Sequence, residues 1–199
     1  MGKALRKTRP LRDTRLQGFA AWVLGLFGWT VEAVPPPEQK CVVIFYPHTS
    51  NWDFVIGIVA RSAIWLPIQW AGKDTLFRWP LGGVFRWLGG IPVNRRERTG
   101  LTARLTEEFA QRKRFYLAIT PEGTRSRTDR WKSGFYHLAL AAQVPLGLAY
   151  IDYPRKRVGI GGYLELTGNE AADLEALRRF YADKTGKHPE HQGEIRFVH

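Results

Sequence analysis

Apolar runs and amphipathic segments alternate along most of the chain, and this alternation predicts strands that are each followed by a helix. The run at 42–46 is apolar throughout, which is typical of a strand buried on both faces of a sheet. The segment 54–64 is apolar nearly all round and predicts a buried helix. We predict further strands at 66–71, 91–94, 115–120 and 144–152, and one or two more within 157–167, with a bend or bulge at Gly161-Gly162. Further helices are predicted at 101–114, 133–143 and from Asn169 or Asp173 to Lys184. This order predicts an α/β fold, in which a single domain has a mostly parallel sheet flanked by helices.

Residues 1–34 differ from the rest of the chain and lead into a proline-rich spacer. Residues 1–17 carry six basic side chains and one acidic side chain, and residues 18–29 carry no charge. The uncharged run is shorter than the roughly 20 apolar residues that span a bilayer. Three interpretations stay open: a helix in the membrane interface, a signal peptide, or a first helix packed on the domain. We favour the first, which divides the chain into a basic and apolar membrane-interface segment at 1–34 and a folded domain at 35–199.

Composition narrows the classes of protein. A length of 199 residues suits one domain with a sizeable core. Cys41 is the single cysteine, so an intramolecular disulfide framework is excluded, and its place in an apolar strand predicts a small buried side chain. The net charge of +12 and the eight tryptophans suit an anionic surface, which is either nucleic acid or lipid headgroups.

The most informative residues are His48 and Asp53. His48 follows the apolar run at 42–46 directly, at the end of a strand where α/β sheets place ligand chemistry. The Thr-Ser-Asn cluster that follows can cap a helix, and this puts Asp53 in the first helical turn. Asp53 can then hold one ring nitrogen of His48 and leave the other to act as a general base. Asn51 is an alternative partner or a cap.

A second cluster, Pro121-Glu122-Gly123-Thr124-Arg125-Ser126, leaves the strand predicted at 115–120. Gly123 permits a tight turn whose N–H groups can face an anion, and Arg125 offers donors suited to phosphate. Glu122 either orients Arg125 or accepts a hydroxyl group of the substrate.

Two more cations, Lys73 and Arg95, follow short predicted strands and can reach the same site. By contrast, the histidines at 137, 188, 191 and 199 show no spacing typical of metal ligands, so we expect no metal site.

The order and spacing of these pieces resemble the lysophospholipid and glycerolipid acyltransferase family, which includes bacterial 1-acyl-sn-glycerol-3-phosphate acyltransferases. The family's first block, a His followed by four residues and an Asp (the HX4D motif), is matched at 48–53. The second block is matched loosely at 90–95, and the third, Pro-Glu-Gly-Thr-Arg-Ser, in full at 121–126. The fourth is matched in part at 144–146, where the second proline often seen in the family is absent. The resemblance spans roughly residues 40–170.

The resemblance implies an O-acyltransferase in which His48 takes a proton from an acceptor hydroxyl and Asp53 holds His48. The hydroxyl oxygen attacks an acyl thioester, either acyl-CoA or acyl carrier protein, with no bound cofactor, no metal and no covalent enzyme intermediate. Arg125, Thr124 and Arg95 would hold the acceptor's phosphate, with 1-acyl-glycerol-3-phosphate as the expected acceptor. An oxyanion stabiliser is required, and the candidates are backbone N–H groups at the start of the helix after His48, and Lys73.

The expected partners are therefore a lipid acceptor, an acyl thioester donor and an anionic membrane surface, with acyl carrier protein as one candidate donor. We expect the protein on the cytoplasmic face of the membrane, peripheral or monotopic, since basic flanks favour that side. The aromatic residues Phe77, Trp79, Phe85 and Trp87 either touch the membrane or form core.

Three alternatives remain. The acceptor is a different lyso-lipid, such as lyso-ornithine lipid or an acylglycerol, in which case Arg125 is structural. The protein is a nucleic-acid-binding module, which the charge favours, although no zinc-finger, RNA-recognition or oligonucleotide-binding signature is present. The protein is a catalytically silent lipid-binding member of the same fold, which the two intact main blocks disfavour.

Overall fold

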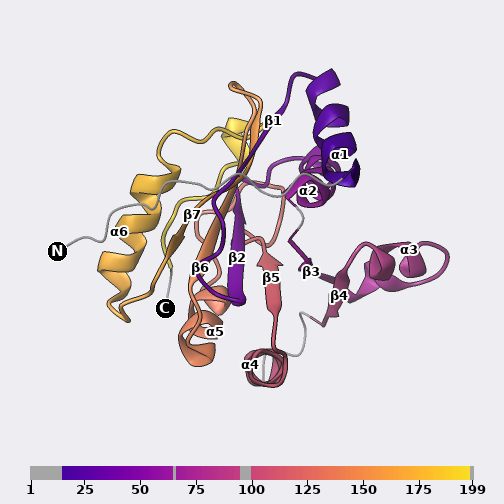
Figure 1. Ribbon diagram of the computed structural model, residues 1–199. Coiled ribbons are helices and arrows are strands. Elements are labelled where there is room, and N and C mark those ends of the chain that lie inside the picture. Colours follow the sequence, from indigo (N-terminus) through magenta and orange to yellow (C-terminus); the bar gives the residue numbers. More distant parts are fainter. Residues whose placement is uncertain (1–14, 65, 95–99, 198–199) are drawn as a thin grey trace.

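A twisted sheet runs through the centre of the molecule, with helices on both of its faces (Figure 1). The structure is a computed structural model and describes residues 15–64, 66–94 and 100–197. Its elements, in chain order, are α1 (Arg15–Leu26), β1 (Thr30–Ala33), β2 (Lys40–Tyr46), α2 (Asn51–Ile64), β3 (Ile68–Lys73), the 3-10 helix η1 (Asp74–Phe77), α3 (Gly82–Trp87), β4 (Gly90–Val93), α4 (Leu101–Gln111), β5 (Phe115–Ile119), α5 (Gly134–Ala142), β6 (Leu146–Asp152), β7 (Arg157–Leu164), α6 (Glu170–Tyr181) and the 3-10 helix η2 (Pro189–His191).

Within the described residues the sheet has seven strands in the order β1-β7-β6-β2-β5-β3-β4. β2 lies at the middle and pairs in parallel with both β5 and β6, so that Val43 lies opposite Ala118 and Gly147. Only β6 and β7 pair antiparallel among these strands, and a register shift between Leu148 and Ala149 leaves Gly161 as an extra residue in β7. The predicted α/β fold with a mostly parallel sheet is confirmed, as is the predicted bulge.

The N-terminal segment contributes more to the sheet than its composition indicated. β1 pairs in parallel with β7 at the edge, from Thr30 opposite Arg157 to Ala33 opposite Ile160. The sheet therefore begins before residue 35, the predicted start of the domain. Four residues of mixed polarity at a half-exposed edge carry no clear strand pattern. The predicted N-terminal helix is present as α1, which packs against α2. No helix in the described part of the chain is long and apolar enough to cross a bilayer.

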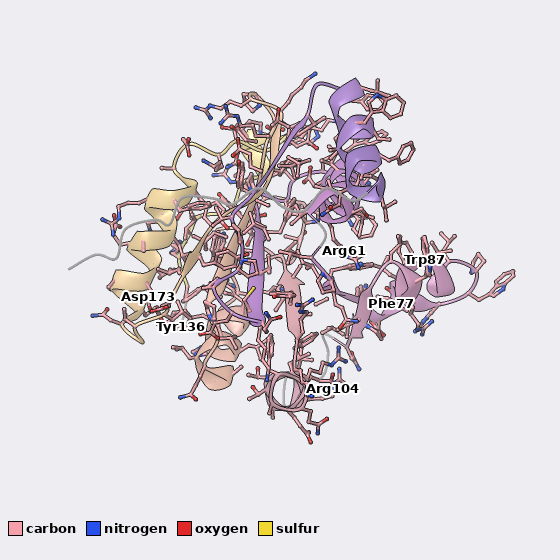
Figure 2. The ribbon with its side chains drawn as sticks, in the orientation of Figure 1. Arg61, Phe77, Trp87, Arg104, Tyr136 and Asp173 are labelled. Atoms are coloured by element: carbon pink, nitrogen blue, oxygen red, sulfur yellow. The ribbon has the colours of Figure 1, made fainter. Side chains whose placement is uncertain are left out.

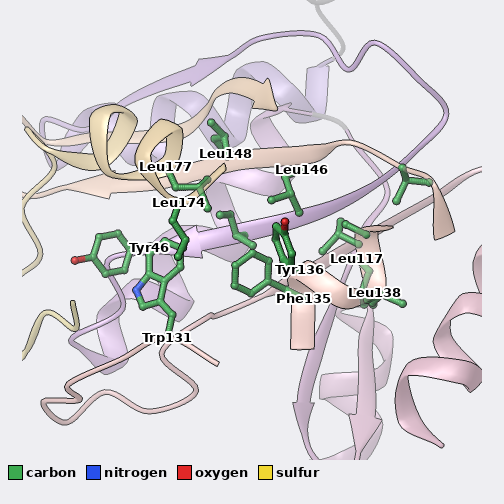
Figure 3. Packing of buried hydrophobic residues seen from close by; sticks show 14 of the residues in the cluster. Tyr46, Leu117, Trp131, Phe135, Tyr136, Leu138, Leu146, Leu148, Leu174 and Leu177 are labelled. Carbon is green, nitrogen blue, oxygen red and sulfur yellow. The ribbon is translucent and has the colours of Figure 1, made fainter. Parts of the chain in front are cut away.

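The two faces of the sheet are covered unequally. Alternate residues of β2 point to opposite faces, so Val42, Ile44 and Tyr46 join the core under α4, α5 and α6. Figure 3 shows this core, in which Tyr46 lies against Trp131 with ring centroids 4.9 Å apart. The other face carries α1 and α2, whose buried side chains meet residues such as Val43 in two smaller clusters. Because these two helices cover only part of that face, space remains between α2 and the sheet.

The sequence left open whether Asn169 or Asp173 caps the last helix, and the structure shows that it is Asn169. Asn169 is the N-cap of α6, and its side chain accepts a hydrogen bond from the N–H of Ala172 at 3.2 Å. Asp173 is buried and accepts hydrogen bonds from Thr167, Gly168 and the Tyr136 hydroxyl, the last at 2.9 Å (Figure 2). These hydrogen bonds connect α6 to α5 and to the loop that follows β7.

Candidate active site

The loop after β2 places His48 at the carboxyl edge of the sheet. β2 ends at Tyr46 and α2 begins at Asn51, so His48 lies in a short turn between them. Ser50 is the residue before α2, and its hydroxyl oxygen accepts the N–H of Trp52 at 3.2 Å. Asp53 in turn accepts the N–H of Ser50 at 2.8 Å, which completes a capping box. Ser50, rather than Asn51, therefore caps the helix.

Asp53 holds His48 from within this cap. The Oδ2 atom of Asp53 lies 3.3 Å from Nδ1 of His48, and it also accepts the N–H of Thr49 at 2.7 Å. The Tyr153 hydroxyl donates to the other oxygen, Oδ1, at 2.6 Å. A contact of 3.3 Å is longer than a typical charge-assisted hydrogen bond, and such contacts tighten when substrate binds. Because Nδ1 faces Asp53, Nε2 is the nitrogen left for a substrate.

The environment keeps Asp53 ionised. Burial of this side chain acts to raise its pKa. The contact with His48 and the hydrogen bonds from the Tyr153 hydroxyl and the Ser50 N–H stabilise the carboxylate and together lower the pKa below its usual value. Asp53 therefore carries a negative charge near neutral pH, which is the state that stabilises a protonated imidazole beside it.

The second motif lies beside the first because β5 pairs with β2. Glu122 follows β5, and its Oε2 atom accepts the backbone N–H of His48 at 2.8 Å. Its Oε1 atom accepts the N–H of Gly193 at 2.8 Å. Glu122 is buried at 2 % exposure, and this burial raises its pKa to about 7 despite the two hydrogen bonds. Glu122 thus binds the backbone of the histidine loop and of the C-terminal segment, a position that neither of its expected roles described.

Three other residues of this motif line a cavity that His48 also lines. Gly123, Thr124 and Arg125 line it, with the side chains of Thr124 and Arg125 exposed. Gly123 has φ +65, a left-handed backbone conformation that favours glycine. The two motifs, which are far apart along the chain, therefore open onto one site as the sequence predicted.

The cavity has a volume of about 550 Å³ and lies between α2 and the sheet. Lys73, at the end of β3, lines it together with His48 and Arg125. These three predicted site residues therefore share one cavity. Its lining is mostly apolar and comes from α2, five strands and the segments beside them, with side chains such as Phe45, Ile58, Ile64, Ile68 and Ile160. Arg95 lies outside the described residues.

Three parts of the site were not predicted, because no sequence motif marks them. Tyr153 binds Asp53 from the turn after β6. The C-terminal segment supplies the N–H of Gly193 to Glu122, and Thr49 accepts the N–H of His188 at 3.1 Å. Arg61 lines the cavity from α2 and donates to the carbonyl of Leu88 at 2.8 Å. A lone arginine within the apolar segment 54–64 is the signal that would have drawn attention to it.

The described residues contain no group of three His, Cys, Asp or Glu side chains that could hold a metal ion. The expectation that the chemistry needs neither a metal nor a bound cofactor stays a prediction.

The acyltransferase family model matches residues 30–150. The 1-acyl-sn-glycerol-3-phosphate acyltransferase of Salmonella typhimurium is 31% identical over 130 residues, which cover 61% of this chain and 52% of that protein. The 1-acyl-sn-glycerol-3-phosphate acyltransferase alpha of Homo sapiens is 31% identical over 122 residues, which cover 56% of this chain and 40% of that protein.

A solved structure agrees in fold. The 1-acyl-sn-glycerophosphate (LPA) acyltransferase PlsC from Thermotoga maritima superposes with a TM-score of 0.55 at 15% identity, covering 84% of this chain and 77% of that chain. The chain spans about half the length of the curated bacterial relatives it matches. The family match covers more than half of the chain, so this protein belongs to the acyltransferase family.

Proposed function

We propose that this protein is an O-acyltransferase that moves a fatty acyl chain from an acyl thioester to a hydroxyl group of a lysophospholipid, with 1-acyl-glycerol-3-phosphate as the acceptor. The observation that carries the proposal is the shared cavity, where a histidine held by a buried carboxylate faces Lys73, Thr124 and Arg125. The names of the relatives point to the same acceptor.

In the proposed reaction His48 acts as the general base. Its Nε2 atom takes the proton of the acceptor hydroxyl while the hydroxyl oxygen forms a bond to the thioester carbonyl carbon. The tetrahedral intermediate then collapses, the carbon–sulfur bond breaks, and the departing thiolate accepts the proton that His48 took from the acceptor hydroxyl. Asp53 keeps the imidazole in one orientation and stabilises its protonated form.

The geometry narrows the choice of oxyanion stabiliser. The N–H groups of Thr49 and Ser50 donate to Asp53, and that of His48 donates to Glu122. These three donors, in the loop that leads into α2, are therefore engaged within the protein. Lys73 lines the cavity and carries a positive charge, so we assign it the developing negative charge on the carbonyl oxygen.

Arg125 and Thr124 hold the acceptor's phosphate at the mouth of the cavity in this proposal, and the apolar depth takes the acyl chain. The donor is acyl-CoA or acyl carrier protein, which bring the same thioester. We place the protein on the cytoplasmic face of the membrane, peripheral or monotopic, where the lipid acceptor resides.

The test is product identification by lipid mass spectrometry. The purified protein receives isotope-labelled acyl-CoA or acyl carrier protein, together with a panel of lyso-acceptors that differ in the headgroup. We expect label in phosphatidic acid. Failure of every acceptor with both donors would refute the proposed function, and a preference for a phosphate-free acceptor would refute the acceptor assignment.

Arg125→Ala sharpens the acceptor assignment. Because Arg125 binds ground state and transition state alike in this proposal, the variant should raise KM for 1-acyl-glycerol-3-phosphate about tenfold with a smaller change in kcat. Arg127→Ala, in the same exposed loop but outside the cavity lining, is the matched control. Equal KM values for the two variants would show that Arg125 does not hold the phosphate.

A further inference from the structure

Large exposed apolar side chains gather on one side of the molecule. In the described part of the chain, the large hydrophobic residues that stand out to solvent all lie within 16–87, on α1, α2 and the region from η1 to α3. α1 and α2 lie on one face of the sheet, and α3 projects beyond the same flank, away from α6 (Figure 1). An exposed apolar surface that is confined to one flank of a protein marks a contact site.

The segment 74–89, which we call the aromatic lobe, has a well-packed interior. Phe77 and Phe85 both turn inward against Trp70, with ring centroids 5.7 and 6.0 Å away, and Phe85 also lies 6.0 Å from the Phe54 ring. The carbonyl of Leu88 at its base accepts hydrogen bonds from Arg61 and from the Trp70 indole, at 2.8 and 3.1 Å. The lobe is therefore a rigid projection, packed through its aromatic interior and bonded at its base to α2 and β3.

Its outer surface is aromatic and basic. Trp79 is 93% exposed and Trp87 is 83% exposed, and Figure 2 shows Trp87 and Phe77 on this projection. Leu81 and Val84 are exposed beside them. The sequence left open whether these aromatic residues form core or touch a membrane, and the structure divides them: Phe77 and Phe85 pack inward, whereas the two tryptophans do not.

Charge identifies the kind of partner. Arg78 and Arg86 are exposed on the lobe, and Lys73 immediately precedes it. Tryptophan and tyrosine favour the headgroup level of a bilayer, and basic side chains bind anionic lipid there. A surface that presents both kinds of side chain on a rigid projection matches the interface of an anionic bilayer.

We propose that the aromatic lobe inserts Trp79 and Trp87 into the headgroup layer of an anionic bilayer, as a contact separate from α1. Leu76 and Phe85 of the lobe also line the cavity, so the same element touches the bilayer and forms part of the cavity wall. The lobe thereby places the cavity beside the lipid surface. This inference rests on the proposed function only for the identity of the lipid that enters.

Flotation with vesicles tests the contact. The full chain is mixed with vesicles of phosphatidylglycerol and phosphatidylcholine, and with vesicles of phosphatidylcholine alone. Trp79→Ser combined with Trp87→Ser should weaken partitioning to the anionic vesicles by about tenfold. Arg78→Ser with Arg86→Ser should do the same, and should lessen the preference for anionic lipid. Arg104→Ser with Arg179→Ser removes two exposed charges from α4 and α6, and should bind as the unaltered protein does.

A site-specific label gives a second readout that does not depend on the double variants. Cys41 is buried at 1% exposure, so Leu81→Cys offers a selective position for an environment-sensitive fluorophore. Its emission should shift to the blue when anionic vesicles are added, and the same label at Arg104→Cys should not respond. Unchanged flotation of the tryptophan variant, or equal responses of the two labels, would overturn the proposal.

Other outcomes separate the rival partners. Loss of a dimer, or loss of binding to acyl carrier protein, with unchanged flotation would assign the lobe to a protein partner and overturn the proposal. Acyl transfer to a lyso-lipid in detergent should persist in Trp79→Ser with Trp87→Ser, whereas transfer to vesicle-embedded acceptor should fall. If the unaltered protein transfers no acyl chain in either form, the proposed function fails, and the flotation result still decides the inference.

Discussion

Two regions of this protein differ in the kind of side chain that is buried and the kind that is exposed. At the carboxyl edge of β2 and β5, acidic side chains are buried and hydrogen-bonded: Asp53 and Glu122 are at most 2 % exposed, and they accept three and two hydrogen bonds. On the flank formed by α1, α2 and the aromatic lobe, large apolar side chains such as Trp79 stand in solvent. Both arrangements are costly for a protein alone in water.

The two regions differ in what compensates for this cost. The buried carboxylates accept hydrogen bonds from backbone N–H groups of the loop around His48, and these bonds hold the loop that carries the imidazole. The exposed apolar flank has no such internal compensation, and a bilayer would supply it from outside. The cavity lies between the two regions and borders both.

The contrast is tested most strongly at His48. His48→Ala should lower kcat by about 10²- to 10⁴-fold, because it removes the proposed general base. The backbone N–H that Glu122 accepts remains in the variant, so the thermal unfolding midpoint should stay close to that of the unaltered protein. Turnover in labelled acyl-transfer assays that matches the unaltered protein would contradict the assignment of the base.

Asp53→Asn separates charge from shape in the buried region. The amide cannot stabilise a protonated imidazole, so kcat should fall by about 10²-fold or more, and the free energy of unfolding should fall by about 1–3 kcal/mol. Tyr153→Phe is the matched control, since it removes one hydrogen bond to Asp53 and leaves the carboxylate. It should cost about 1 kcal/mol and less than tenfold in kcat. Equal kinetic losses in the two variants would show that the charge of Asp53 is not essential.

Glu122 predicts a pH dependence of stability with a definite sign. Its pKa rises from 4.5 to about 7 on folding, so the folded state binds the proton more tightly than the unfolded state. Its contribution is therefore fully present below pH 4.5 and is lost as the pH rises through about 7. The pKa of Asp53 is lowered, so Asp53 acts in the opposite sense and at lower pH.

The comparison of unaltered protein with Glu122→Gln isolates this group, because glutamine does not titrate. Denaturant unfolding should show the stability of the unaltered protein falling relative to the variant, by on the order of 3 kcal/mol between about pH 4.5 and pH 7.5. A stability difference that stays constant over this range would refute the raised pKa.

The smallest effects are expected in the apolar region, at Gly57. This residue lines the cavity from α2, and a Cβ atom there would meet only the Phe45 ring, at 3.9 Å. Gly57→Ala should fit and raise the unfolding midpoint by about 2–4 °C, because alanine favours the helix by up to about 1 kcal/mol. Gly57→Leu should narrow the cavity and shift acyl preference toward shorter chains in a competition assay. An unchanged preference in the leucine variant would show that the chain does not lie along this part of α2.

Much of the architecture was readable from local pattern. The alternation of apolar runs with helices predicted the mostly parallel sheet, and the spacing of His48 and Asp53 predicted their contact across a helix cap. These features were predictable because they depend on neighbours within a few residues. β1 was not predicted, because an edge strand of four residues gains its identity only by pairing with β7.

The amino-acid sequence alone determined which chemical groups are present and how the loop around His48 is built, since capping and turn formation are local. The tertiary structure alone decided that Glu122 holds the backbone of the histidine loop, that Tyr153 and Gly193 support the site, and that Trp79 is exposed whereas Phe77 is buried. Each of these depends on contacts between segments far apart in the chain, and such contacts form only when the sheet brings those segments together.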